Sequence, residues 1–442
     1  MINKLKEYKN IILSLIKLSL PILGGNVSHI LIGFADNIVA GQYSTVALGA
    51  ISVASAIVMT VTIAAIGLIL GISPVIANFR GENICCKKFF KLSLLFALVV
   101  SVPFFLILEI LLAKIGFLGL SAELVEPTRQ YIEICAWSIF PAAIFVAAKE
   151  FLQAYEKVVF ANLTMLLSVI LNIILNIILT FGFDFSFIHI EAMGIVGLSI
   201  ATLVSKIFTA VLILIYCLPL FKGVFVYSKK YIQTLFKVGT PISLAIFFEF
   251  LGFNMTAILI GKFSALLTAV HNIILCIANF TFMIVLSVAN AASIKIGYFN
   301  GKKDKLNIIK YAKANIFLAI VVCFATFSLL IFFSDGIISI FSPDKEVLQL
   351  SKKILKIAMC FLFFDGIQGA CVGILKGLKD TKIIMFATLF GYVCVAIPLG
   401  CYLAFCKNII LEGFWIGLAL ALFLMAVITS SKVILKIKQM KD

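Results

Sequence analysis

Long apolar segments, separated by short polar or glycine-containing breaks, run along the whole chain and constrain its fold more than any other feature. Each is long enough for a helix across the hydrocarbon core, which needs about 20 residues. Of the 442 residues, 63% are hydrophobic and 13% charged, against about 45–50% and about 25% in soluble domains. This excludes soluble enzymes, nucleic-acid binders and secreted disulfide scaffolds. We expect an all-α integral membrane protein with twelve transmembrane helices, at residues 13–38, 45–74, 92–114, 131–154, 158–181, 194–219, 238–261, 265–293, 310–333, 350–377, 384–405 and 413–435.

The charges indicate how the chain crosses the membrane. A formal net charge of +16 results from 36 Lys and Arg against 20 Asp and Glu. The basic residues gather at both ends and in every second connection, for example at Lys87, Lys88, Lys302 and Lys303. Because cytoplasmic loops are enriched in Lys and Arg, we predict that both termini are cytoplasmic. Abundant Ile, Lys and Phe favour a bacterial source, and therefore a multi-pass protein of the bacterial cytoplasmic (inner) membrane with no nucleic-acid partner.

The second half of the chain repeats the first at one nearly constant offset, which drifts slightly farther along. Six spans in each half give both halves the same orientation, so the repeat predicts two six-helix lobes related by a pseudo-two-fold axis along the membrane normal. Parallel repeats of this kind enclose a substrate site near the midplane and alternate access by rocking. We expect an N-lobe at residues 1–218, a cytoplasmic linker at 219–237 and a C-lobe at 238–442. The aligned pairs include Pro21 with Pro241, Gly41 with Gly261, Ser44 with Ser264 and Gly81 with Gly301.

Most of the 20 carboxylates lie in loops or near helix ends, but three do not: Asp36 in the first span, Glu249 in the seventh and Asp365 in the tenth. A charge at the bilayer centre costs at least about 2.5–3.5 kcal/mol, so such residues usually face a cavity. The alternative is a structural pairing with a buried lysine or a backbone group. Lys206, in the middle of the sixth span, either reaches toward the inner surface or balances a carboxylate.

Polar residues at helical spacing accompany these acids. Asn172 and Asn176 belong to a stripe on the fifth span, and Thr202 lies on the sixth. Their oxygens beside Asp36 are the ligands that a small cation prefers, although hydrogen bonding between helices is an alternative reason for such a stripe. Possible cavity-lining residues are Asn26, His29, His271, Asn272 and Asn290, for which core packing is the alternative. No cofactor and no metal beyond a possible Na⁺ are expected.

With these residues in place, the chain resembles the multidrug and toxic compound extrusion (MATE) family over nearly its whole length. The matching segments are short, but they follow one another in order through twelve spans. They are Pro21-Ile22, Gly33-Phe34-Ala35-Asp36, Val39-Ala40-Gly41, Ser73–Ala77 with Gly81, Gly194–Thr202, Gly239–Ile242, Ala289–Ser293 before Gly297, and Gly413–Gly417.

The resemblance implies secondary active antiport, in which mostly cationic, amphipathic drugs or toxins leave as Na⁺ or H⁺ enters. It implies coupling-cation sites at Asp36 with Asn172, Asn176 and Thr202 in the N-lobe. Glu249 and Asp365, which indicate the NorM-type branch, are implied to bind the coupling cation and drugs in the C-lobe. Antibiotic resistance, membrane lipids as neighbours and a monomeric state are part of the same expectation.

Other functions fit the sequence less well. A lipid-linked oligosaccharide flippase, or another lipid flippase of the same superfamily, carries a phosphate-bearing substrate and calls for Arg or Lys in its cavity. Here the charged residues in the middle of the spans are acidic, except for Lys206. An integral membrane enzyme is not expected, because the chain has neither a HExxH metal pair nor a GxSxG elbow. A proton-conducting subunit of a respiratory complex needs a line of buried Lys and Glu.

Overall fold

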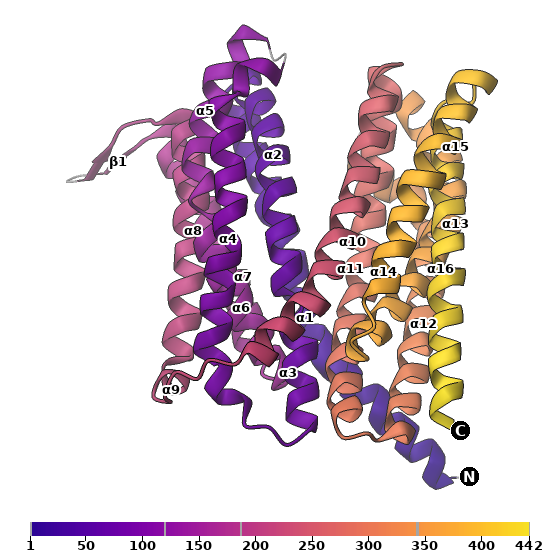
Figure 1. The fold of residues 1–442 in the computed structure, drawn as a ribbon. Helices are drawn as coiled ribbons and strands as arrows, with labels where there is room; N and C mark the ends of the chain where they lie inside the picture. Colours follow the sequence, from indigo (N-terminus) through magenta and orange to yellow (C-terminus); the bar gives the residue numbers. More distant parts are fainter. Residues whose placement is uncertain (1, 119–120, 186–187, 342–343, 442) are drawn as a thin grey trace. The chain divides into compact units, whose positions relative to one another are not determined.

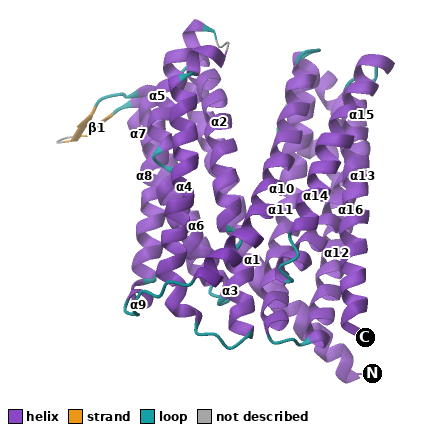
Figure 2. Cartoon of the chain, viewed as in Figure 1, coloured by secondary structure: helices purple, strands orange, loops and turns teal. Residues whose placement is uncertain are grey.

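The computed structural model describes residues 2–118, 121–185, 188–341 and 344–441, which are almost entirely helical (Figures 1 and 2). A short hairpin of β1 (Phe183–Phe185) and β2 (Ile188–Ile190) is the exception within these ranges. The α-helices are α1 (Ile2–Tyr43), α2 (Thr45–Ile69), α3 (Ile72–Gly81), α4 (Phe90–Ala113), α5 (Ala122–Ala136), α6 (Ile139–Ala154), α7 (Val159–Phe181), α8 (Gly194–Tyr216), α9 (Leu218–Phe221), α10 (Lys229–Gly261), α11 (Ala265–Gly301), α12 (Lys305–Ser339), α13 (Lys345–Gly377), α14 (Lys382–Thr388), α15 (Ile397–Cys401) and α16 (Leu411–Lys441). Short 3₁₀ helices are η1 (Cys86–Phe89) and η2 (Ile115–Leu118), and π-helices are η3 (Leu389–Ala396) and η4 (Tyr402–Cys406).

The predicted all-α membrane fold is confirmed, with eleven described spans and a twelfth if α5 and α6, bent by 42°, form one crossing. The sequence predicts this fourth span as one helix from residue 131, but the chain turns at Trp137 and Ser138. Proline four residues after each break explains where the helices stop, because its ring clashes with the carbonyl four residues earlier. Pro141 acts on Trp137 in this way, and Pro74 on Leu70, where α2 gives way to α3.

The described chain forms two compact units. The N-terminal unit comprises residues 24–76 and 85–243, and the C-terminal unit comprises the chain up to Leu23, Ala77–Ile84 and the chain from Leu244 onward. Two of the boundaries fall within α1 and α10, at Gly24 and Leu244, which are equivalent positions of the sequence repeat. Helix α10 begins at Lys229, inside the segment 219–237 that the sequence indicates as a linker.

Local structure recurs at the offsets of the sequence repeat. Ser44 and Ser264 both cap a helix, each through its hydroxyl oxygen. Asn83 and Lys303, which the same offset aligns, adopt left-handed φ values of 60° and 59°. Glu156 and Lys379, which the slightly larger offset of the later segments aligns, adopt 62° and 59°. At all four corners the next residue donates its backbone N–H five residues back, for example Asp304 to Phe299 at 2.9 Å. This agreement supports the two-lobe repeat, whose symmetry axis stays a prediction.

In the N-terminal unit, α7 is apolar outside and polar inside. Its buried residues include Ser168, Asn172 and Asn176, whereas Ile170 and Ile174 are exposed. This inverts the pattern of a soluble helix, and it suits a helix whose outer face meets lipid. Helix α8 packs closely against α7 because Gly197 leaves no side chain between itself and the backbone of Leu179. The close packing brings the polar faces of both helices together.

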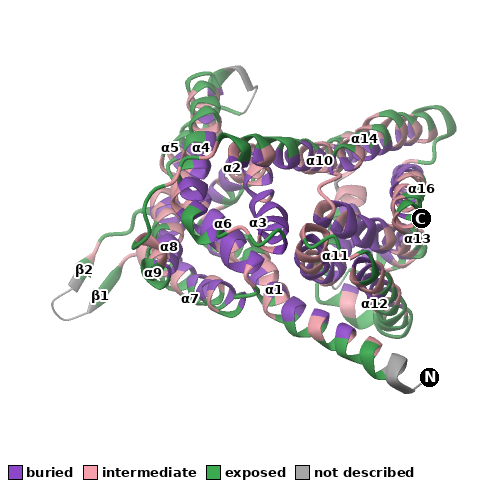
Figure 3. Ribbon diagram, turned by 60° about the horizontal axis from the view of Figure 1, so that its bottom comes forward, coloured by how far each residue is buried: buried purple, intermediate pink, exposed green. Residues whose placement is uncertain are grey.

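In the C-terminal unit, α13 packs against α11 and α16 and is mostly purple in Figure 3, the colour of buried residues. Trp415, Phe361 and Phe414 are almost fully buried in the apolar core of this unit. The predicted eleventh span departs from an α-helix at η3 and η4. Pro398, which lies between them, cannot donate to the carbonyl of Cys394 within η3, so the wider π turns accommodate a missing α-helical bond.

Candidate functional site

The buried Asp36 is the centre of a polar cluster in the N-terminal unit. Its side chain on α1 is 7% exposed. Asn176 of α7 donates its amide N–H to Asp36 Oδ1 at 2.7 Å and to Asn172 Oδ1 at 3.1 Å. From α8, the hydroxyl of Thr202 lies between two acceptors, Asp36 Oδ2 at 3.4 Å and the carbonyl oxygen of Leu198 at 3.1 Å. The structure therefore brings together all four residues that were predicted for the N-lobe.

Several atoms of this cluster lack a hydrogen-bond partner. They include Asn176 Oδ1, Asn172 Nδ2 and Thr180 Oγ1, all buried. Orphaned buried polar atoms are rare and call for a ligand or a water. Carboxylate, amide and hydroxyl oxygens lie within one cluster, and such hard oxygens suit a small cation. A proton on Asp36 is the chemical alternative. The arrangement can thus hold either Na⁺ or H⁺.

None of the three predicted carboxylates is neutralised by a direct ion pair. Within the described part of the chain, Asp36, Glu249 and Asp365 have no lysine, arginine or histidine nitrogen within 4.0 Å. Lys206, the half-buried lysine of α8, instead donates to Ser138 Oγ at 2.9 Å. The geometry disfavours the structural alternative, in which each acid is tied to a lysine.

The second acidic site, in the C-terminal unit, combines Glu249 of α10 with Asp365 of α13. Asp365 is 6% exposed and lies within electrostatic range of Glu249. Tyr392 of η3 is within range of both acids and 1% exposed. Its ring packs on Phe253 at a centroid distance of 5.4 Å. A Cβ at Gly252 would approach the Tyr392 ring to 2.7 Å, so glycine permits the contact.

Sequence reasoning missed Tyr392 and Gly252. The available signal was Gly252 itself, which lies one helical turn after Glu249 and therefore marks a place where another side chain can approach α10. Tyr392 gave no sequence signal, because its direction depends on the π turns of η3. A pattern that assumes α-helical periodicity does not predict where a side chain in a π-helix points.

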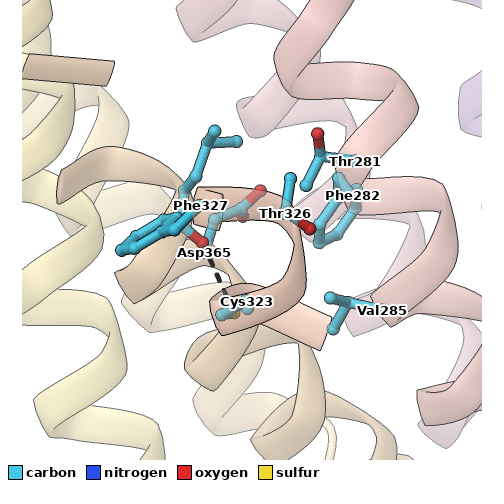
Figure 4. Close-up of a pocket in the computed structure, with 9 residues that line it drawn as sticks. Thr281, Phe282, Val285, Cys323, Thr326, Phe327 and Asp365 are labelled. Atoms are coloured by element: carbon cyan, nitrogen blue, oxygen red, sulfur yellow. Dashed lines mark hydrogen bonds between the residues drawn. The ribbon is translucent and has the colours of Figure 1, made fainter. Parts of the chain in front are cut away.

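Asp365 also borders a small cavity between α11, α12 and α13 (Figure 4). Its volume, about 10 Å³ for a water-sized probe, corresponds to about one water molecule. Thr281 and Thr326 line it, and their hydroxyls donate to the carbonyls of Ile277 at 2.9 Å and Val322 at 2.7 Å. Since each hydroxyl proton is engaged, the threonine oxygens present lone pairs rather than donors.

The five predicted lining residues are scattered. His271 is fully buried against Trp415, with a ring-centroid distance of 5.7 Å, and belongs to the core of the C-terminal unit. Asn272 is exposed, and Asn290 is half-buried. On α1, Asn26 is half-buried and His29 exposed. In the described residues, no group of three or more His, Cys, Asp or Glu is placed to hold a metal ion.

Solved structures show what the fold resembles. The crystal structure of the eukaryotic MATE transporter AtDTX14 superposes with a TM-score of 0.85 at 19% identity, covering 97% of this chain and 96% of that one. A MOP superfamily transporter from Pyrococcus furiosus, described by the reverse polarity of its binding pocket, gives 0.86 at 20% identity, covering 98% and 97%. Both likenesses concern the fold alone.

Sequence relatives agree. The probable multidrug resistance protein NorM of Photorhabdus laumondii is 29% identical, over 95% of this chain and 94% of that protein. The multidrug resistance protein NorM of Aliivibrio fischeri is 27% identical, over 93% and 92%. The MatE family model matches residues 21–178 and 241–402, which include all three acids. The chain therefore belongs to the MATE family, whose members are membrane transporters rather than enzymes.

Proposed function

We propose that this chain is a multidrug efflux transporter of the bacterial cytoplasmic membrane, exporting cationic, amphipathic compounds in exchange for Na⁺ or H⁺. The observation that carries the proposal is a buried acidic site in each unit, with no carboxylate held in a direct ion pair by a basic residue of the described chain. The names of the NorM relatives support the substrate class.

The acidic residues supply the exchange chemistry. A lipophilic cation is attracted to a carboxylate buried inside the protein, because opposite charges interact strongly where the dielectric is low. Binding of Na⁺ or H⁺ at the same or a coupled carboxylate neutralises that attraction and releases the drug. In transporters built from parallel repeats, the two lobes rock against each other. Such rocking would expose the acids first to one side of the membrane and then to the other.

Two separate acidic sites allow more than one coupling cation per exported drug. Exchange of one monovalent drug for one cation moves no net charge and gains nothing from the membrane potential. A second coupling cation makes transport electrogenic, and one charge crossing 100 mV releases about 2.3 kcal/mol. We therefore expect efflux to accelerate when the membrane potential is made negative inside.

The proposal is tested with purified protein in liposomes, where export of ethidium is followed under a Na⁺ gradient and under a pH gradient imposed separately. We expect at least one gradient to drive export. Asp36→Asn, Glu249→Gln and Asp365→Asn should each abolish the driven component. Asp184→Asn, on the exposed hairpin, is the matched control and should transport normally. Wild-type transport in all three of these variants, or no response to either gradient, would overturn the proposal.

The flippase alternative is not favoured. A lipid-linked oligosaccharide presents phosphate groups, which Arg or Lys recognises through charge-assisted hydrogen bonds. The sites described here instead place carboxylates at both centres, and the lysine near Asp36 donates to a serine.

A further inference from the structure

Lys206 is a half-buried basic residue beside the Asp36 cluster that the exchange described above does not use. It lies on α8 one turn after Thr202, whose hydroxyl donates to Asp36 Oδ2. Four residues of helix correspond to about 6 Å along the axis. Lys206 therefore lies near the polar cluster around Asp36 without belonging to it.

Ser138 holds the ammonium in this position. The Lys206 Nζ donates to Ser138 Oγ at 2.9 Å, and Ser138 is fully buried at the break between α5 and α6. Because Pro141 fixes the break, the backbone that carries the Ser138 hydroxyl has a defined position. The Lys206 charge thus has a defined place, away from the carboxylate.

The charge nevertheless acts on Asp36, which is within its electrostatic range. Among the described residues, His29 of α1 and Cys135 of α5 are further titratable groups within electrostatic range of Lys206. With the ammonium counted, the site that would receive a cation carries one negative and one positive charge. A cation that binds there meets the attraction of Asp36 and, at longer range, the repulsion of Lys206.

We propose that Lys206 is a positioning residue that sets the affinity of the Asp36 site for its coupling cation. It keeps the site from binding the cation too tightly, so that the cation can leave on the inner side. When the site empties, the ammonium remains as an internal counter-charge and Asp36 is not left alone in a medium of low dielectric. The inference rests on the proposed coupling at Asp36 and adds the residue that tunes it.

Three variants test the inference because they change the charge and its place separately. Lys206→Met removes the charge while keeping an apolar stem, Lys206→Arg keeps the charge, and Ser138→Ala frees the ammonium to approach Asp36. The measured quantity is the half-saturating concentration of the coupling cation for efflux from liposomes: Na⁺ at fixed pH, and H⁺ with Na⁺ omitted.

We expect Lys206→Met to lower the half-saturating concentration roughly tenfold, since one unit charge at this range acts through a partly screened medium. Ser138→Ala should raise it several-fold, and Lys206→Arg should stay within twofold of wild type. The opposite signs of Lys206→Met and Ser138→Ala are decisive, because a merely structural lysine would give loss of folded protein in both and no change in half-saturation.

A second readout separates this inference from the proposed transport activity. The half-saturating cation concentration for thermal stabilisation of the detergent-purified protein is measured for the same variants. If the wild type fails to exchange but its stabilisation shifts as described, the transport proposal fails and the role of Lys206 stands. Unchanged half-saturation in Lys206→Met in both assays, or a wild type that no cation stabilises, overturns the role of Lys206.

Discussion

The acidic sites of the two units differ in composition. In the N-terminal unit a single carboxylate, Asp36, receives hydrogen bonds from Asn176 and Thr202 and has Lys206 within electrostatic range. In the C-terminal unit Glu249 and Asp365 share one region with Tyr392 and a water-sized cavity. The first site has many oxygen ligands and little net charge, whereas the second has more charge and an aromatic ring. We infer that the first suits a small desolvated cation and the second a larger organic one.

Removing the acids should separate the two roles and gives the largest expected effect. Asp365→Asn should weaken binding of a lipophilic cation on the order of 100-fold, because a buried charge is lost where the dielectric is low. Asp36→Asn should leave that affinity within a few-fold and abolish coupling. Equilibrium binding of tetraphenylphosphonium to detergent-purified protein checks the first, and gradient-driven efflux the second. Equal losses of affinity in both variants would remove the distinction between the sites.

The contact between α10 and η3 should matter for the organic cation alone. Gly252→Val drives a side chain into the Tyr392 ring, so the ring must move from the acids. We expect roughly tenfold weaker binding of tetraphenylphosphonium, the amount that loss of a desolvated cation–π contact accounts for. Gly336→Val in α12, where a Cβ meets nothing within 4 Å, is the control for a new β-branched residue in this unit. Unchanged binding in Gly252→Val would exclude Tyr392 from the site.

Removing one oxygen from the N-terminal site should have a smaller effect, on the coupling cation alone. Thr202→Val removes the hydroxyl that donates to Asp36 while keeping the shape of the side chain. A hydrogen bond to a charged group contributes about 1.5–3 kcal/mol, but the contact at 3.4 Å is longer than usual, so we expect only a several-fold change in cation half-saturation. Drug affinity should not change. A loss of drug affinity instead would show that the two sites share this residue.

The smallest effect concerns the corners that the two halves repeat. Asp304 caps α12 by accepting the backbone N–H of Asn307 at 3.0 Å, whereas Ile84 occupies the equivalent place in the first half and has no capping oxygen. We expect Asp304→Ala to cost about 1 kcal/mol of stability. The bonds from Asn307 hold the pKa of the Asp304 carboxyl below its usual value. Its stabilisation is therefore present above the usual pKa of about 4 and lost as the pH falls through the lower value of the folded protein. Thermal unfolding at neutral and acidic pH should show the variant approaching wild type in acid.

The helices and the acid positions could be predicted from sequence because lipid imposes simple rules. Apolar length predicts the spans, and a carboxylate such as Asp36 in a span predicts a polar partner on another helix. The four-residue spacing of Asn172 and Asn176 places both on one face of α7, and the structure confirms that face as buried.

What escaped prediction depends on backbone geometry that periodicity does not encode. The bend at Trp137, the π turns of η3 and the hairpin at Phe183–Ile190 all interrupt a pattern rather than follow one. Tyr392, which lies within electrostatic range of both acids, belongs to one of these interruptions, η3. His271 shows the converse: a polar residue in a span that packs in the apolar core beside Trp415.

The unit boundaries within α1 and α10 have a consequence for how the protein is made. Tyr231, near the start of α10, is fully buried in the N-terminal unit and its hydroxyl hydrogen-bonds Ser93 at 2.7 Å. Ser14 of α1 pairs with Tyr311 in the C-terminal unit at 3.3 Å. A ribosome that has completed the sixth span has therefore not yet supplied everything that the first unit needs. Neither unit can finish assembling until synthesis has passed the middle of the gene, and two separately expressed halves would each lack a helical segment that the other carries.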